Sequence, residues 1–181
     1  MVSNQVDMKL NKLTVDVTKV QQSLEESKRN ILEEKDRESR GNNIIIYRVP
    51  EGNTKDETNK NDKTFCMELC RGALGIDTEE IDFKSIFRLG RFESGTTRPI
   101  LVQLREKTLK NQIMEKLFKL RTAEDKFRNI SITHDLTQKE RAECKALVDE
   151  AKRKQAEDSG EFIWRVRGLP GQLKLIKIKK H

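Results

Sequence analysis

The first forty residues carry a heptad pattern, which constrains the fold more than any other feature of the chain. Apolar residues recur at alternating spacings of four and three, the seam of a coiled coil. Neither glycine nor proline interrupts the stretch before Gly41, so one continuous helix is expected. The predicted seam consists of Val6, Leu10, Leu13, Val17, Val20, Leu24 and Ile31.

This seam predicts self-association. β-Branched residues at the d positions, Val6 and Val20, favour a trimer over a parallel dimer. The alternative is a single amphipathic helix packed on a globular part, but the seam is narrow and the remaining surface is highly charged. We therefore expect residues 1–40 to form a homo-oligomeric coiled coil, which would raise the avidity of weak binding modules joined to it.

The segment 41–133 alternates short apolar strands with helices. Strands are expected at 43–50, 81–92, 98–104 and 129–133, and helices at 64–76 and 107–121, with a polar loop after the first strand. The order strand, helix, strand, strand, helix, strand is the split βαβ, ferredoxin-like arrangement. An α+β chain is therefore expected, and its βαββαβ module has the architecture of the RNA recognition motif.

Arginines are expected to replace the aromatic side chains on the sheet of this module. RNA recognition motifs stack bases on aromatics of their first and third strands, but here Ile45, Leu101 and Gln103 occupy those places. Arginine forks onto phosphate oxygens, which lysine does not. An ordinary solvated face with internal salt bridges is the alternative. The candidate phosphate ligands are Arg48, Arg88, Arg91, Arg98 and Arg105.

Residues 134–181 are expected to form a small basic domain of one helix and a β-hairpin. Thr137 and Glu140 have capping-box spacing, and the helix is expected to end near Glu157. A turn at 168–171 is predicted to place Trp164, Val166, Ile176 and Ile178 on the face that packs against the helix. The opposite face would then carry four cations, Arg165, Arg167, Lys177 and Lys179.

Four like charges on one hairpin face need an explanation, because opposed like charges destabilise a hairpin. One explanation is that exposed lysines deter pairing with further strands. The other is that a phosphate backbone binds there and relieves the repulsion. The whole basic excess of the chain lies after Arg40, with 29 basic and 22 acidic residues. A localised excess of this kind indicates a polyanionic partner, most commonly nucleic acid.

Enzymatic and membrane functions find little support in the sequence. It contains neither a P-loop nor a dinucleotide-binding glycine pattern. Its three cysteines, Cys66, Cys70 and Cys144, are too few for a disulfide framework, which indicates a reducing compartment, and they lack the close spacing of a metal site. No stretch approaches the ~18 apolar residues of a membrane span. We therefore expect no catalysis, metal, cofactor, small-molecule substrate or membrane association.

Several stretches, in a fixed order, resemble one protein family. A coiled coil ends at RESRGNNIIIYRVPE, IFRLGRF and TRPILVQL follow, NISITHDLTQKER comes next, and a short basic part closes the chain. This order is similar to that of the RNA-binding protein encoded by the first open reading frame of LINE retrotransposons. The resemblance implies a coiled-coil trimer that binds single-stranded RNA and DNA, coats its element's RNA and acts as a nucleic acid chaperone in retrotransposition. It also implies a cytoplasmic ribonucleoprotein with nuclear entry.

The resemblance further assigns nucleic-acid contacts to individual cations. The matching positions are Arg37 and Arg40 at the end of the coil, Arg98 at the third strand, Arg121 at the end of the second helix, and Arg141 in the C-terminal helix. Phosphate contacts with little sequence specificity are expected. Two other functions stay open: a coiled-coil scaffold whose degenerate RNA recognition motif binds protein, and a host RNA-binding protein derived from such an element.

Overall fold

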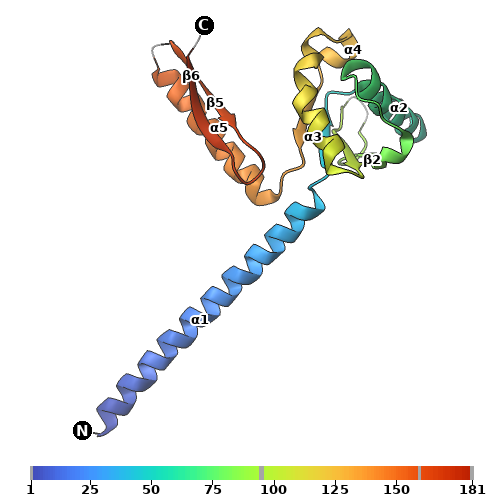
Figure 1. Ribbon diagram of the computed structural model, residues 1–181. Coiled ribbons are helices and arrows are strands. Elements are labelled where there is room, and N and C mark those ends of the chain that lie inside the picture. The colour runs from blue at the N-terminus through green and yellow to red at the C-terminus, as the bar shows by residue number, and fades with distance from the viewer. Residues whose placement is uncertain (1, 94–95, 159, 180–181) are drawn as a thin grey trace. The chain divides into compact units, whose positions relative to one another are not determined.

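The computed structural model describes residues 2–93, 96–158 and 160–179, with side chains described from residue 9 onward. The chain is of the α+β type and divides into two compact units, Met1–Ser39 and Arg40–His181. The elements, in chain order, are α1 (Val2–Ser39), β1 (Asn43–Tyr47), α2 (Lys55–Glu68), the π-helix η1 (Leu69–Ala73), the 3-10 helix η2 (Glu80–Asp82), β2 (Phe83–Arg88), β3 (Ile100–Leu104), α3 (Lys107–Glu115), the 3-10 helix η3 (Lys116–Thr122), α4 (Asp125–Arg128), β4 (Ser131–His134), α5 (Gln138–Glu157), β5 (Phe162–Arg167) and β6 (Lys174–Lys179) (Figure 1).

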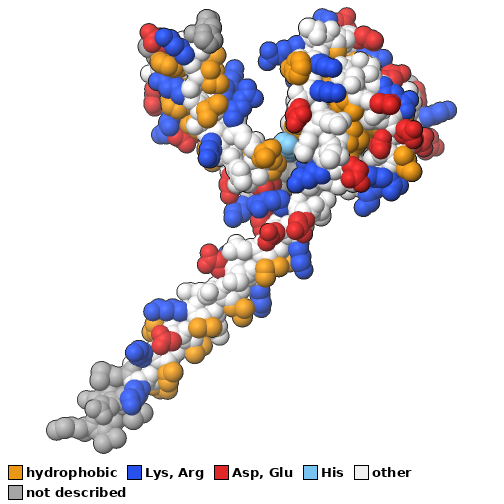
Figure 2. Space-filling model, viewed as in Figure 1, with side chains coloured by type: hydrophobic (Ala, Val, Ile, Leu, Met, Phe, Trp, Pro, Cys, Tyr) orange, Lys and Arg blue, Asp and Glu red, His pale blue; other side chains and the backbone are white. Residues whose placement is uncertain are grey.

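The first unit is the single long helix α1, as the heptad pattern predicts. Its seam side chains from Leu10 to Ile31 are between 53% and 68% exposed, and Figure 2 shows hydrophobic side chains in a row along the helix. The side chain of Val6 lies outside the described residues. An exposed apolar row at heptad spacing is the surface that partner helices cover in a coiled coil.

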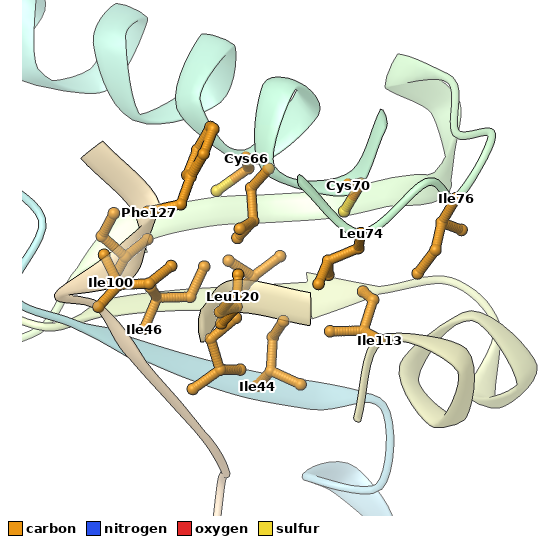
Figure 3. Close-up of a cluster of buried hydrophobic side chains, with 14 of the residues drawn as sticks. Ile44, Ile46, Cys66, Cys70, Leu74, Ile76, Ile100, Ile113, Leu120 and Phe127 are labelled. Carbon is orange, nitrogen blue, oxygen red and sulfur yellow. The ribbon is translucent and has the colours of Figure 1, made fainter. Parts of the chain in front are cut away.

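The second unit is built on a four-stranded antiparallel sheet with the strand order β2-β3-β1-β4. Successive residues of a strand point to opposite faces. Ile44 and Ile46 of β1 therefore point into the hydrophobic core, together with Val102 of β3. Figure 3 shows Ile44 and Ile46 among other buried side chains gathered between the helical segments and the strands. Each fully buried side chain of this kind stabilises the fold by roughly 1.5–3 kcal/mol.

The helix α2 begins at Lys55, within the stretch that the sequence predicted to be a polar loop. The Thr54 side chain accepts a hydrogen bond from the N–H of Glu57 at 3.2 Å, and the Glu57 carboxylate accepts one from the N–H of Asn53 at 2.9 Å. These bonds satisfy N–H groups that a helix start leaves unpaired. The first two turns carry mostly polar residues, so apolar periodicity did not indicate them, whereas the pattern Thr-x-x-Glu could have done so.

The C-terminal elements follow the prediction for the helix. Thr137 and Glu140 form the expected capping box, with N–H to oxygen distances of 3.2 and 3.0 Å, and α5 ends at Glu157. The hairpin of β5 and β6 packs on α5, mainly through β5. The side chain of Gln155 joins them, because it donates to the carbonyl of Phe162 and accepts from the N–H of Trp164, both at 3.0 Å.

A buried ion pair ties the helical layer of the middle module (residues 41–133) to its sheet. The Arg88 guanidinium, at the end of β2, donates two hydrogen bonds to the Asp62 carboxylate of α2, at 2.7 and 2.5 Å. The two side chains are only 2% and 3% exposed. Arg88 also donates to the carbonyl oxygens of Val49, Pro50 and Arg98, which fixes the chain after β1 and before β3.

Replacing Asp62 by alanine is expected to lower the free energy of unfolding by about 3–5 kcal/mol, because the positive charge of Arg88 would stay buried without its counter-ion. Urea unfolding followed by circular dichroism measures this loss. Asp56→Ala is the matched control, since this exposed acid in the first turn of α2 meets the helix dipole and its removal should cost under about 1 kcal/mol. Equal losses in the two variants would contradict the assignment.

Candidate nucleic-acid interface

Arg88 does not belong to a phosphate-binding surface, contrary to the sequence prediction. A guanidinium has five N–H donors, and in Arg88 all of them bond to Asp62 or to backbone carbonyls. Binding a phosphate would break these bonds and the module core with them. Arg88 is therefore a structural residue.

Arg98 is also engaged within the module, although less completely. Its side chain is 14% exposed, and Nε and Nη2 lie 3.1 and 3.0 Å from one Glu51 carboxylate oxygen. Burial raises the pKa of Glu51. Hydrogen bonds from Arg98 and the positive charges of Arg88 and Arg98 together lower it by more, so the pKa lies below its ordinary value. Glu51 is thus charged at neutral pH, and a phosphate must compete with it for Arg98.

The other three arginines predicted for the middle module are exposed. Arg48 follows β1 with a φ of 65°, a left-handed conformation that costs energy in a residue other than glycine. Arg105 follows β3 and donates to the carbonyl of Ile81 at 2.5 Å. Arg91 lies in the connection between β2 and β3. These three side chains are accessible to a polyanion.

The four remaining arginines assigned by resemblance lie on separate elements. Arg37 is in the last turn of α1, Arg121 is exposed in the last turn of η3, and Arg141 is exposed on α5. Arg40 donates to the Asp135 carboxylate at 2.8 Å, and Asp135 also accepts from Asn43 at 2.9 Å. Asp135 therefore fixes the start of the C-terminal segment to the beginning of β1, a role that the sequence did not indicate.

The hairpin register differs from the prediction and changes which side chains share a face. The loop spans residues 168–173, with Gly168 and Gly171 at positive φ. This number of loop residues is even, as is that of the predicted turn at 168–171, and it pairs Trp164 with Lys177 and Arg165 with Ile176. The predicted faces therefore did not follow from the predicted turn. The four predicted cations are thus divided: Arg165 and Arg167 lie on one face, and Lys177 and Lys179 on the other. The predicted face of four positive charges does not form.

The face with Lys177 packs toward α5, and on it the charge of Lys177 is balanced by nearby groups. The Lys177 ammonium lies 3.9 Å from the ring centroid of Phe162 and 5.5 Å from that of Trp164. It also pairs with the Asp158 carboxylate at 3.3 Å. Lys154 of α5 covers Trp164 at 4.8 Å. Cations held over aromatic faces are attracted by the ring quadrupole, so Lys177 stabilises the hairpin and is a weak candidate for a phosphate ligand.

The other hairpin face, which we name the outer hairpin face, is exposed and mixes cations with isoleucines. The register groups Ile163, Arg165, Arg167, Lys174, Ile176 and Ile178 there. The three cations are exposed, and Ile176 and Ile178 are each more than a third exposed. This face can bind anions and has apolar surface beside them.

The open face of the four-stranded sheet, opposite the core, carries aromatic side chains that the sequence prediction missed. Phe87 of β2 is 42% exposed and Tyr47 of β1 is 37% exposed. The usual stacking positions lie on the first and third strands, where this chain has Ile45 and Leu101. Strand alternation in β2, together with the strand order, could have indicated Phe87.

Within the described part of the chain, no group of three potential ligands is arranged for a metal ion. The thiols of Cys66 and Cys70 are buried, and burial raises both pKa values, that of Cys70 to about 12. None of the described helices is long and apolar enough to cross a membrane.

Comparison with protein-family models and with curated proteins finds no match for this chain.

Replacing Lys177 by alanine is expected to lower the stability of the hairpin by about 0.5–1 kcal/mol, since it removes the cation from two aromatic rings. Lys174→Ala on the outer hairpin face should cause no such loss. Thermal unfolding followed by the fluorescence of Trp164, the single tryptophan, measures both. In the register that the sequence predicted, Lys174 and not Lys177 would share the Trp164 face, so the opposite ranking would contradict the observed pairing.

Proposed function

We propose that the chain binds single-stranded nucleic acid, chiefly RNA, through phosphate contacts with little sequence specificity. The middle module is proposed to be a ferredoxin-like RNA recognition motif. The strand order β2-β3-β1-β4 supports this, as does the alternation of its main strands and helices. The fold alone does not establish RNA binding; the exposed cations are what favour it.

The observation that carries the proposal is the outer hairpin face. Arg165 and Arg167 are both exposed there, and Lys174 extends the row from the neighbouring strand. From Glu161 to the end of the chain there are six basic residues and one acidic residue. Exposed cations with few acids beside them release counter-ions when they meet phosphates, which drives sequence-independent binding. Arg48, Arg91 and Arg105 of the middle module add further accessible charge.

We further propose that the chain is the RNA-coating and chaperone protein of a LINE-type retrotransposon. The support is the resemblance of several sequence stretches, in their order, to that family, together with the exposed heptad seam of α1 and the basic hairpin. A coiled-coil trimer and a cytoplasmic ribonucleoprotein with nuclear entry belong to this proposal. A host protein derived from such an element would bind RNA in the same way. A scaffold whose module binds protein would not.

Removing the two arginines of the outer hairpin face tests the phosphate contacts. Arg165→Ala with Arg167→Ala is expected to weaken binding of a single-stranded RNA of about forty nucleotides and to make the salt dependence shallower by roughly 1.4 in log–log slope, 0.7 for each lost contact. Fluorescence anisotropy at several salt concentrations measures both effects.

The control has the same charge change elsewhere in the C-terminal segment. Lys139→Ala with Lys152→Ala removes two exposed cations of α5 and should leave the slope nearly unchanged. Identical slopes in the two double variants would contradict a role for the hairpin. Absence of RNA binding by the intact protein at low salt would favour the protein-binding scaffold instead.

Leu24→Asp is expected to dissociate the oligomer, because it places a charge in the middle of the α1 seam. Apparent RNA affinity should fall by more than about tenfold as the linked modules separate. Sedimentation equilibrium and RNA anisotropy measure the two effects. The control is Leu32→Asp, since Leu32 is exposed on α1 but lies off the seam. A Leu24→Asp variant that stays oligomeric would contradict the assigned seam.

A further inference from the structure

The open face of the sheet holds an apolar platform that phosphate contacts do not use. Its members are Phe87, Leu101 and Ile45, which lie opposite one another in a row across β2, β3 and β1, and Tyr47, two residues further along β1. Neighbouring strands are about 4.8 Å apart. Phe87 and Tyr47 are therefore separated by roughly 10 Å or more, and each ring can meet a different planar group.

The exposure of these side chains changes sharply across the platform. Ile45 and Leu101 are 6% and 8% exposed although they point away from the core, whereas Phe87 and Tyr47 are 42% and 37% exposed. The two exposed rings thus lie beside a buried apolar surface formed by Ile45 and Leu101. A sheet face that meets only water normally carries polar side chains. A face with two exposed aromatic rings instead indicates a ligand with flat, partly apolar surfaces.

The charged residues around the platform favour one class of such ligands, those that also carry negative charge. Arg48 directly follows Tyr47 and is held in the left-handed conformation, and Arg105 follows β3 on the same face by strand alternation. Two acids of neighbouring segments have other partners: Glu51 holds Arg98, and Asp82 accepts the N–H of Glu79 at 2.8 Å. Aromatic rings bordered by cations are the combination that binds single strands, with bases on the rings and phosphates at the cations.

We propose that Phe87 and Tyr47 are base-stacking residues for single-stranded RNA, while Arg48 and Arg105 bind the flanking phosphates. Phe87 comes from β2, which carries none of the usual stacking positions, and Tyr47 lies two residues beyond Ile45, the usual position on β1. The inference rests on the proposed RNA binding and deepens it. It adds a base contact that is tolerant of sequence, because every base has a π-face.

Two oligonucleotides of equal length and charge separate stacking from phosphate binding. One is a uridine homopolymer of about twenty nucleotides, and the other has the same ribose-phosphate backbone without bases. The full-length protein is expected to bind the uridine strand about tenfold or more tightly. In the variant Tyr47→Ala with Phe87→Ala this preference should disappear, while affinity for the abasic strand and the salt slope stay unchanged.

A matched control is Phe118→Ala. Phe118 is 66% exposed on η3, in the helical layer, so its removal should leave the preference for the uridine strand intact. A second variant does not depend on removing the rings: Phe87→Trp in a Trp164→Phe background. Its indole emission is expected to be quenched by the uridine strand and not by the abasic one.

The outcomes separate this inference from the proposed function. Equal affinity of the intact protein for both strands would overturn stacking but leave phosphate-based RNA binding in place. Failure to bind either strand at low salt would overturn both. If the Phe87→Trp variant still binds the uridine strand but its indole emission is not quenched, the stacking role of that position is overturned, whether or not the double alanine variant folds.

Discussion

The second unit depends on the buried contact between Arg88 and Asp62. Burying two charges is costly unless their attraction and additional hydrogen bonds compensate, and here the guanidinium also satisfies three backbone carbonyls. The pair joins α2 to β2 and to the chain segments that leave β1 and enter β3. It thereby holds the helical layer on one side of the sheet. The helical layer therefore does not cover the opposite face, on which Phe87 and Tyr47 are exposed.

Burial decides what each arginine does, and residue type alone cannot reveal it. Arg88 and Arg98 resemble Arg48 and Arg105 in the sequence, since all four lie in or beside predicted strands. The first two point to Asp62 and Glu51, which come from α2 and from the segment after β1. The α2 carboxylate lies in the stretch that the sequence predicted to be a loop. A carboxylate in an expected loop gives no sign that it will lie buried against Arg88.

Much of the fold and part of the candidate site could be predicted from the sequence. Heptad spacing indicated α1, apolar runs indicated the strands, and the capping box indicated the start of α5, because each is a local pattern with one dominant structural cause. The hairpin faces could not be obtained from alternation alone. Alternation gives two faces to each strand, and whether the loop has an odd or an even number of residues decides which faces coincide. The predicted four-residue turn and the observed six-residue loop are both even, so counting residues across the turn would already have placed Arg165 on the face of Ile176. Predicting that Phe87 is exposed likewise requires the strand order, because the order shows which strands lie beside it.

Stacking and phosphate contacts respond differently to salt. A site that combined them would keep part of its affinity as salt rises. Counter-ion release weakens every phosphate contact as salt rises, whereas a base lying on Phe87 or Tyr47 is held mainly by apolar and π contacts, which salt does not screen. In the proposed complex each contact alone would be weak, and neither would select a sequence. Several modules joined through the α1 seam would bind one strand together, so that affinity comes from number rather than from any single strong site. In the proposed function, this arrangement would allow the protein to coat RNA of any sequence.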